Sequence, residues 1–179
     1  MKKSIRKGFT IVEMLMVMGI IAVLLGLVST AAMTAIRHAR DRKASACQQI
    51  LQAGIATYRS QMGEWPGVLK SWSENGMPNS SRNRELTQSE YDAVISAVVK
   101  ESVNQSGTPM MDVTGLIVAP KGSNGSWGIE FREAVKKQKR HGGTIKISDM
   151  AFGYQPTGGG FRRFKISYNA DSDSVTVYK

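Results

Sequence analysis

The sequence predicts an α+β fold in which one long N-terminal α-helix is followed by a globular head that ends in an antiparallel β-sheet. Two observations support this prediction. An uncharged apolar segment near the N-terminus continues without a break into an amphipathic helical pattern, and the C-terminal part alternates apolar and polar residues in short runs separated by turn residues. With 179 residues, the chain has room for one core and an anchoring element.

The first element is an apolar helix preceded by a short basic leader. The 23 residues from Met14 to Ile36 carry no charge, and a helix of that length is about 35 Å long, which is enough to cross a bilayer. A secretory signal peptide has a shorter apolar core. Because the leader holds four cations, we expect it to stay in the cytoplasm, with the rest of the chain across the membrane.

The net charge and the cysteine count restrict the class of protein. The chain has 24 Lys and Arg against 14 Asp and Glu, a formal net charge of +10. Such an excess raises nucleic acid or anionic membrane as a partner, but four of the cations belong to the leader. Cys47 is the single cysteine, so no intramolecular disulfide can form, and we expect its side chain to be a small buried apolar group.

One carboxylate, Glu13, stands at the start of the apolar helix. An ionised group inside a bilayer is costly and needs a partner of opposite charge. Glu13 lies four residues, or one helical turn, after Phe9. Two interpretations are open: Glu13 docks onto a cation supplied by another chain, or it extends to the membrane surface from the end of a simple anchor.

The segment Gly8-Phe9-Thr10-Ile11-Val12-Glu13, with its basic leader and apolar helix, resembles the processing motif of type IV prepilins and type II secretion pseudopilins. The resemblance implies that a prepilin peptidase cleaves between Gly8 and Phe9 and methylates the new amino terminus of Phe9. It further implies that Glu13 contacts the N-terminus of a neighbouring subunit in a filament. The implied partners are copies of this chain, other pilins or pseudopilins, and an inner-membrane assembly platform.

Beyond the membrane segment, apolar residues continue at helical spacing, so we expect the helix to extend to Met62 and pack against the head. The apolar stripe consists of Cys47, Leu51, Ile55, Tyr58 and Met62. We therefore divide the chain into a leader (1–8), a transmembrane and assembly segment (9–36), an amphipathic helix (37–62) and an α+β head (63–179). The resemblance places the protein in the bacterial inner membrane as a single-pass chain, with its head in the periplasm or on a surface filament.

The predicted helix ends in a short motif that consists of Tyr58, Gly63, Trp65 and Pro66. Gly63 can adopt the left-handed conformation that ends a helix, Pro66 prevents its resumption, and Trp65 can fix the exit loop to the head. The motif and its spacing from Phe9 resemble major pseudopilins. An ordinary helix stop explains the glycine and the proline equally well.

The head is expected to contain short helices and strands joined by turns. Ser71 to Arg84 reads as a loop, and Thr87 with Glu90 forms a capping box before a helix from Gln88 to about Ser102. The remaining predicted elements are a strand at Gly115–Ala119, a helix at Ile129–Lys139, strands at Thr144–Phe152 and Phe161–Tyr168, and a strand at Val175–Tyr178 that closes a hairpin through Asn169–Ser174.

Two features of the head suggest ligands. Asn169, Asp171 and Asp173 alternate oxygen groups in a tight loop, and major pseudopilins often hold calcium near the C-terminus. These residues are also good turn formers, so we expect no cofactor, with calcium as the alternative. The cations of Lys136–Arg140 and Arg162–Lys165 could form one face for DNA or an acidic polysaccharide, but we favour a solvated face over nucleic-acid binding.

No Gly-rich phosphate loop, metal cluster or nucleophile motif occurs in the sequence, so we do not expect an enzyme. The expected function is that of a structural filament subunit, and the helix-end motif favours a type II secretion pseudopilus. Two alternatives remain open. The chain could be a type IV pilin or minor pilin for adhesion, motility or DNA uptake, or a single-span anchor that presents a binding domain.

Overall fold

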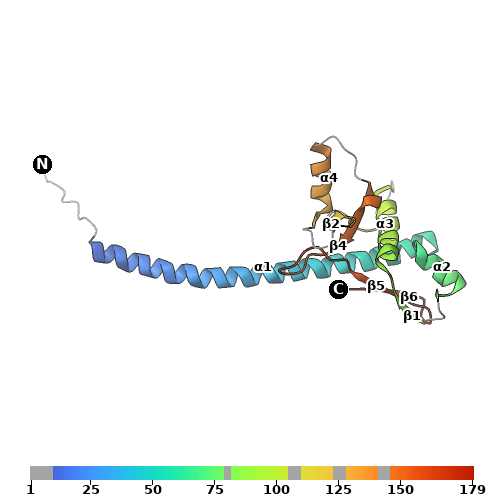
Figure 1. Ribbon diagram of the computed structural model, residues 1–179, viewed down its shortest axis with the longest axis horizontal. Helices are drawn as coiled ribbons and strands as arrows, with labels where there is room; N and C mark the ends of the chain where they lie inside the picture. The colour runs from blue at the N-terminus through green and yellow to red at the C-terminus, as the bar shows by residue number, and fades with distance from the viewer. Residues whose placement is uncertain (1–9, 79–81, 105–109, 123–127, 141–145) are drawn as a thin grey trace. The chain divides into compact units, whose positions relative to one another are not determined.

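The computed structural model describes residues 10–78, 82–104, 110–122, 128–140 and 146–179. It confirms the α+β fold: a long helix, α1, comes first, and antiparallel sheets follow (Figure 1). The chain divides into two compact units, Met1–Ala39 and Arg40–Lys179. The elements are α1 (Ile11–Met62), α2 (Val68–Asn75), β1 (Asn83–Glu85), α3 (Gln88–Asn104), β2 (Ile117–Pro120), β3 (Ile129–Glu130), α4 (Phe131–Arg140), β4 (Met150–Gly153), β5 (Lys165–Asn169) and β6 (Ser174–Tyr178).

The part of α1 in the second unit packs on the core through one stripe of small and apolar residues. Ala44, Cys47, Leu51 and Ile55 of this stripe are buried. The predicted stripe is confirmed as far as Tyr58, which is half-buried against the core, whereas Met62 is 42 % exposed. Cys47 is 2 % exposed, and its thiol points to the carbonyl oxygen of Gly115 at 3.7 Å. The expectation of a small buried apolar cysteine is therefore confirmed.

Two three-stranded antiparallel sheets form the head, with strand orders β1-β5-β6 and β3-β2-β4. The predicted C-terminal hairpin is confirmed, because β5 pairs with β6 from Lys165↔Tyr178 to Asn169↔Ser174. Phe164, Ile166 and Tyr168 are all buried, as the period of two residues predicts. The first sheet thus owes its register to an apolar face that can lie only toward the core.

The outer edge of β6 is covered by side chains of α1 rather than by another strand. Gln48 donates from its amide to the carbonyl oxygen of Val177 at 2.8 Å. Gln52 donates to the carbonyl oxygen of Val175 at 2.6 Å and accepts from the N–H of Val177 at 2.6 Å. These bonds satisfy backbone groups that would otherwise be open to pairing with another strand.

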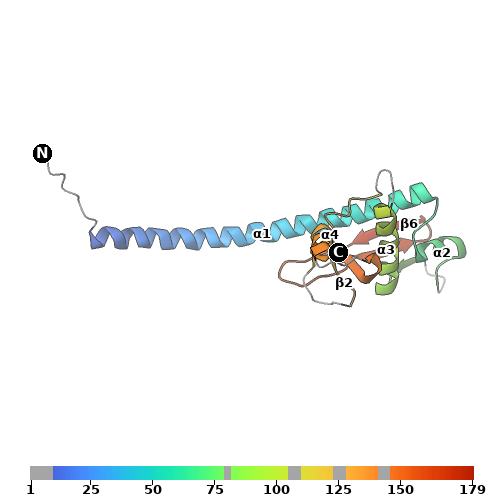
Figure 2. The same ribbon diagram turned by 90° about the horizontal axis from the view of Figure 1, so that it is seen from above.

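The prediction of a loop from Ser71 to Arg84 is wrong at both ends. Residues 71–75 belong to α2, and β1 begins at Asn83. α2 forms because Leu69 and Trp72, three residues apart, are buried against the core at 0 % and 4 % exposure. The burial of these side chains overrides the turn-forming character of the polar residues around them. Figures 1 and 2 both show α2 beside the C-terminal end of α1.

The helix predicted after Thr87 is confirmed, and its capping box forms as expected. Thr87 donates from its backbone N–H and its hydroxyl to Glu90 at 2.7 and 2.8 Å, and the N–H of Glu90 points back to the hydroxyl of Thr87 at 3.5 Å. The resulting helix, α3, extends two residues beyond Ser102, to Asn104.

Several predicted elements begin earlier in the sequence than the observed ones. Ile129 and Glu130 form the short strand β3, so the helix after them begins at Phe131. A 3-10 turn at Ile147–Asp149 precedes β4, and the earlier residues of that predicted strand, 144–145, lie outside the described residues. β5 begins only at Lys165, while Arg162 forms an isolated bridge with Tyr154. The bridge connects the end of β4 to the segment that enters β5.

Candidate functional site

The N-terminal unit presents an exposed apolar helix. Its large side chains are exposed throughout, from Ile11 at 81 % to Ile36 at 54 %. Its most apolar 18-residue window has a mean hydropathy of 2.7, and none of that window is buried. By length and composition this helix can cross a membrane, which indicates a single-pass, membrane-anchored chain. Gly8 and Phe9, the residues predicted for processing, lie outside the described residues.

Hydroxyl groups within this apolar segment are bonded to the backbone of their own helix. Ser29 donates to the carbonyl oxygen of Leu25 at 2.7 Å, Thr30 to Leu27 at 2.9 Å, and Thr34 to Thr30 at 3.1 Å. Because each hydroxyl proton is used internally, these residues are compatible with a hydrocarbon environment.

Glu13 forms a capping box with Thr10 at the start of α1. Thr10 donates to Oε2 of Glu13 from its backbone N–H at 2.9 Å and from its hydroxyl at 3.0 Å. The N–H of Glu13 donates to the Thr10 hydroxyl at 3.3 Å. The spacing Thr-x-x-Glu is the same signal that identified the cap of α3, and the sequence analysis overlooked it here.

The capping box fixes the Glu13 carboxylate at the first turn but uses only one of its two oxygens. Both bonds from Thr10 go to Oε2, and among the described residues Oε1 of Glu13 has no hydrogen-bond partner. Glu13 therefore has one oxygen held by its own chain and one that can accept a bond from outside it.

The helix-end motif spans the end of α1, where Tyr58 is half-buried against the core. The helix ends at Met62, Gly63 has a φ of +73°, and its N–H donates to the carbonyl oxygen of Arg59 at 2.9 Å. This is the left-handed helix stop that the sequence predicts. Trp65 is 6 % exposed and Pro66 is also buried, so both are fixed to the head.

The motif connects to the C-terminal hairpin through Asp173, which the sequence suggested as a turn former or a calcium ligand. Asp173 accepts bonds from the indole N–H of Trp65 and the hydroxyl of Tyr168, both at 2.7 Å, and forms an ion pair with Arg59. The backbone carbonyl of Asp173 also accepts a bond from Arg59 at 2.9 Å. We call Arg59, Trp65, Tyr168 and Asp173 the Asp173 cluster.

The electrostatics of the Asp173 cluster favour an ionised carboxylate. Partial burial acts to raise the pKa of Asp173, but the bonds from Tyr168 and Trp65 and the charge of Arg59 outweigh it, so the pKa is lowered. The Arg59 guanidinium also lies over the Trp65 ring, 4.2 Å from its centroid. The cluster joins the end of α1 and its exit loop to the C-terminal hairpin, two segments that are distant in sequence.

In the loop predicted as an alternative calcium site, the side-chain oxygens of Asn169 and Asp173 accept bonds from donors of the chain itself. The side-chain oxygen of Asn169 accepts bonds from the N–H groups of Asp171 and Ser172 at 2.9 and 3.2 Å, as in an Asx turn. The Asp173 carboxylate is occupied by its cluster, so a cation would have to displace the Arg59 guanidinium. Within the described ranges, no group of three or more His, Cys, Asp or Glu residues is arranged to hold a metal.

The two groups of cations that could have formed one face have different partners. Arg163 pairs with Asp92 of α3, and Lys165 pairs with Glu85 of β1. α4, which carries Lys136, packs beside β2 and β3 instead. Figures 1 and 2 both place α4 toward the opposite end of the head from α2.

Comparison with known proteins identifies a motif in the N-terminal segment. Residues 3–29 match the family model described as the prokaryotic N-terminal methylation motif. No curated protein and no solved structure was found to match the chain. The matched range includes Gly8, Phe9 and Glu13, and it supports a type IV pilin-like structural subunit that prepilin peptidase processes. It does not include the head, so it does not distinguish a pilin from a pseudopilin.

Proposed function

We propose that this chain is a subunit of a type II secretion pseudopilus that is processed by prepilin peptidase and assembled from the inner membrane. The observation that carries the proposal is an exposed apolar helix whose first turn holds a capped Glu13, within a matched methylation motif. Neither the capping box nor the apolar surface is used within the described head. Both are available for contacts between subunits.

Processing removes residues 1–8 and creates an ammonium group at Phe9. Gly8 has no Cβ, so a peptidase can approach the scissile bond closely. Removal of the leader also takes away four cations that hold the N-terminus on the cytoplasmic side. The methylated amine of Phe9 then lies one residue before Thr10, next to the helix cap.

Assembly provides the charge partner that Glu13 lacks in the membrane. The carboxylate is held by Thr10 through Oε2, and Oε1 accepts a bond from the N-terminal ammonium of a neighbouring subunit. An ion pair inside hydrocarbon is strongly favoured over the two separated charges. The bond therefore selects the register in which the apolar helices bundle, with the head carried into the periplasm.

The helix-end motif supports a pseudopilus over a surface pilus. Tyr58, Gly63, Trp65 and Pro66 keep the spacing that resembles major pseudopilins, and Trp65 is tied to the C-terminal hairpin through Asp173. The single cysteine also leans toward pseudopilins, because many type IV pilins carry a C-terminal disulfide.

The test is a Glu13→Gln variant expressed in the native host beside a Glu74→Gln control. Both changes remove one carboxylate, but Glu74 is exposed on α2 in the head. Mass spectrometry should find both chains starting at N-methyl-Phe9. Cross-linking in the membrane should then give ladders of subunits for the wild type and the control and only monomer for Glu13→Gln.

A chain that keeps Met1 in the native host would overturn the proposal and leave a membrane-anchored binding domain. Deletion of the gene separates the finer alternatives. Loss of secreted proteins from the medium with surface pili intact supports the pseudopilus, whereas loss of surface pili with normal secretion supports a pilin.

A further inference from the structure

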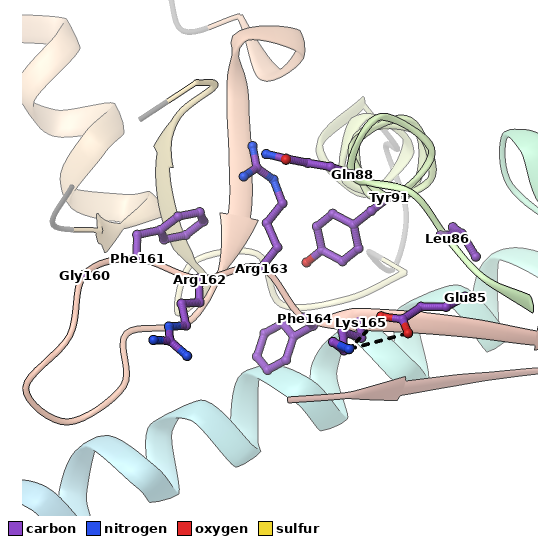
Figure 3. Close-up of a pocket in the computed structure, with 10 residues that line it drawn as sticks. All are labelled: Glu85, Leu86, Gln88, Tyr91, Gly160, Phe161, Arg162, Arg163, Phe164 and Lys165. Carbon is purple, nitrogen blue, oxygen red and sulfur yellow. Dashed lines mark hydrogen bonds and ion pairs between the residues drawn. The ribbon is translucent and has the colours of Figure 1, made fainter. Parts of the chain in front are cut away.

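A pocket of about 520 Å³ opens on the head between the start of α3 and residues 160–165, which lead into β5 (Figure 3). Its volume lies in the range of sites that hold small ligands or short peptide segments. No lining residue belongs to α1. The lining therefore belongs entirely to the unit Arg40–Lys179.

Arg163 is held rigidly at this pocket by Asp92. Its guanidinium donates from Nε and Nη2 to the two carboxylate oxygens at 2.9 and 3.2 Å, and the side chains are only 13 % and 11 % exposed. With its amide oxygen turned toward the guanidinium, Gln88 accepts from Nη1 at 2.5 Å and from Nη2 at 3.2 Å. Figure 3 shows the ends of Arg163 and Gln88 converging. Asp92 and Gln88 together leave one Nη1 N–H of this fixed guanidinium, and that group can donate to a ligand carboxylate.

The charge of the pocket is positive. Arg162, Arg163 and Lys165 line it together with one carboxylate, that of Glu85. The pair between Lys165 and Glu85 is 3.0 Å long and largely exposed, at 56 % and 44 %, so water and ligands can exchange with it at little cost. The Arg162 side chain is exposed and has no ion-pair partner among the described residues. Even with Asp92 counted, the group retains one positive charge.

Aromatic side chains form the apolar part of the lining. Tyr91 is 2 % exposed and its hydroxyl donates to the carbonyl oxygen of Phe152 at 2.7 Å, which fixes the ring. Phe161 lines the pocket as well and is 5 % exposed. A peptide can place an apolar side chain against these rings beside an acidic one.

We propose that this pocket binds a short acidic peptide segment of a partner protein. One Asp or Glu carboxylate of the segment contacts Arg163 and Gln88, and a neighbouring apolar side chain lies against Tyr91 and Phe161. Arginine sites that read acidic segments in this way are a recurring mode of peptide recognition. Lys165 contributes a second, exchangeable cation at the rim.

The test uses the full chain in detergent micelles and the peptide fluorescein-Leu-Glu-Phe-Glu-Leu-amide, labelled at its N-terminus, and follows binding by fluorescence anisotropy. The comparison peptide has Gln in place of both Glu residues. The key variant is Gln88→Glu, in which the new carboxylate occupies Arg163 and repels the ligand. A glutamate is compatible with the first turn of α3 because of the helix dipole. The control is Gln138→Glu, which makes the same charge change on the exposed surface of α4.

We expect saturable binding of the acidic peptide, at least about tenfold weaker binding of the Gln peptide, and a similar loss for Gln88→Glu, since one charged hydrogen bond is lost in each case. Gln138→Glu should bind as the wild type does. Equal weakening by both variants would reduce the effect to general electrostatics and overturn the proposal. Equal affinity for the two peptides, or the absence of saturable binding, would also overturn the proposal. The same holds if a labelled DNA oligonucleotide binds more tightly than the acidic peptide and Gln88→Glu weakens its binding.

Discussion

Asp173 holds the end of α1 to the C-terminal hairpin. Replacing its carboxylate with an amide tests how much this contact contributes to the free energy of unfolding. In Asp173→Asn the ion pair with Arg59 is lost and an amide N–H₂ group faces the donors of Trp65 and Tyr168. We expect a loss of about 1–3 kcal/mol in the free energy of unfolding. Urea unfolding of the full chain in detergent measures it. Asp171→Asn, two residues away on the exposed loop, should change it by less than about 0.5 kcal/mol.

The same carboxylate predicts a pH dependence. The folded-state pKa of Asp173 lies below its ordinary value of 3.8. A lowered pKa means that the stabilisation is complete above the unfolded-state pKa and is lost as the pH falls through the folded-state pKa. The difference in unfolding midpoint between wild type and Asp173→Asn should therefore be constant near neutral pH and shrink below about pH 4. A difference that grows on acidification would contradict the assignment.

Gly153 is required where β4 meets the segment that enters β5. A Cβ at this position would collide with the backbone carbonyl oxygen of Arg162 and come within 2.8 Å of the Phe161 ring. The collision falls on the Tyr154–Arg162 bridge, whose two backbone bonds are 2.7 and 2.8 Å long. We expect Gly153→Ala to lower the free energy of unfolding by about 2–3 kcal/mol, measured by urea unfolding.

The control is Gly115→Ala, where an added Cβ meets no atom within 4 Å. Its unfolding midpoint should equal that of the wild type. If both alanine variants were equally stable, the close approach at Gly153 would have no energetic consequence.

At the scale of elements, the contact between α1 and β6 depends on side-chain amides. Gln52 makes two bonds to the edge of β6, one as donor and one as acceptor. In Gln52→Leu both backbone groups lose their partner, so we expect a loss of about 2 kcal/mol. Amide hydrogen exchange at Val177 should accelerate. Gln49→Leu, at an exposed position of the same helix, should leave the exchange rate unchanged, and equal effects of the two variants would contradict the role of Gln52.

The elements that sequence predicts well are those with a strong local signal. α1, α3 and the C-terminal hairpin combine periodic apolar residues with a glycine stop, a capping box or a turn. α2 lacks such a signal, because its helix depends on burying Leu69 and Trp72 against residues from other elements. The division into two sheets could not be predicted from the sequence either, because β4 pairs with β2, a strand 30 or more residues away. Its apolar pattern does not say which strand it joins.

The same distinction between local and long-range signals applies to the residues of the candidate site. Glu13 was recognised from its local motif, and Thr10 could have been found from the same Thr-x-x-Glu spacing. The Asp173 cluster and the pocket at Arg163 could not be found that way, because their members come from segments about 70 or more residues apart. A charged side chain that is ion-paired in the fold cannot be distinguished in the sequence from one that is exposed to solvent.

At the scale of the whole molecule, the distribution of buried residues predicts that the head folds without the membrane segment. The first buried residue of the described core is Ala44, and all others follow it, so the core belongs entirely to the unit Arg40–Lys179. Residues 40–62 contribute Cys47, Leu51 and Ile55 to that core. A fragment of residues 40–179 should therefore be soluble without detergent and unfold cooperatively.

The measurement is thermal unfolding by circular dichroism, with the fragment compared with the full chain in detergent. Because residues 10–39, the described part of the lost segment, are all exposed, we expect Tm values within about 5 °C of each other. A second fragment, residues 63–179, keeps every strand but lacks the helical stripe that covers the first sheet and the amides that cap β6. It should show no cooperative transition, since Val175, Val177 and the edge of β6 would be open to solvent. Cooperative unfolding of this shorter fragment would show that α1 is only attached to the head, and failure of the 40–179 fragment would show that the core needs the membrane segment after all.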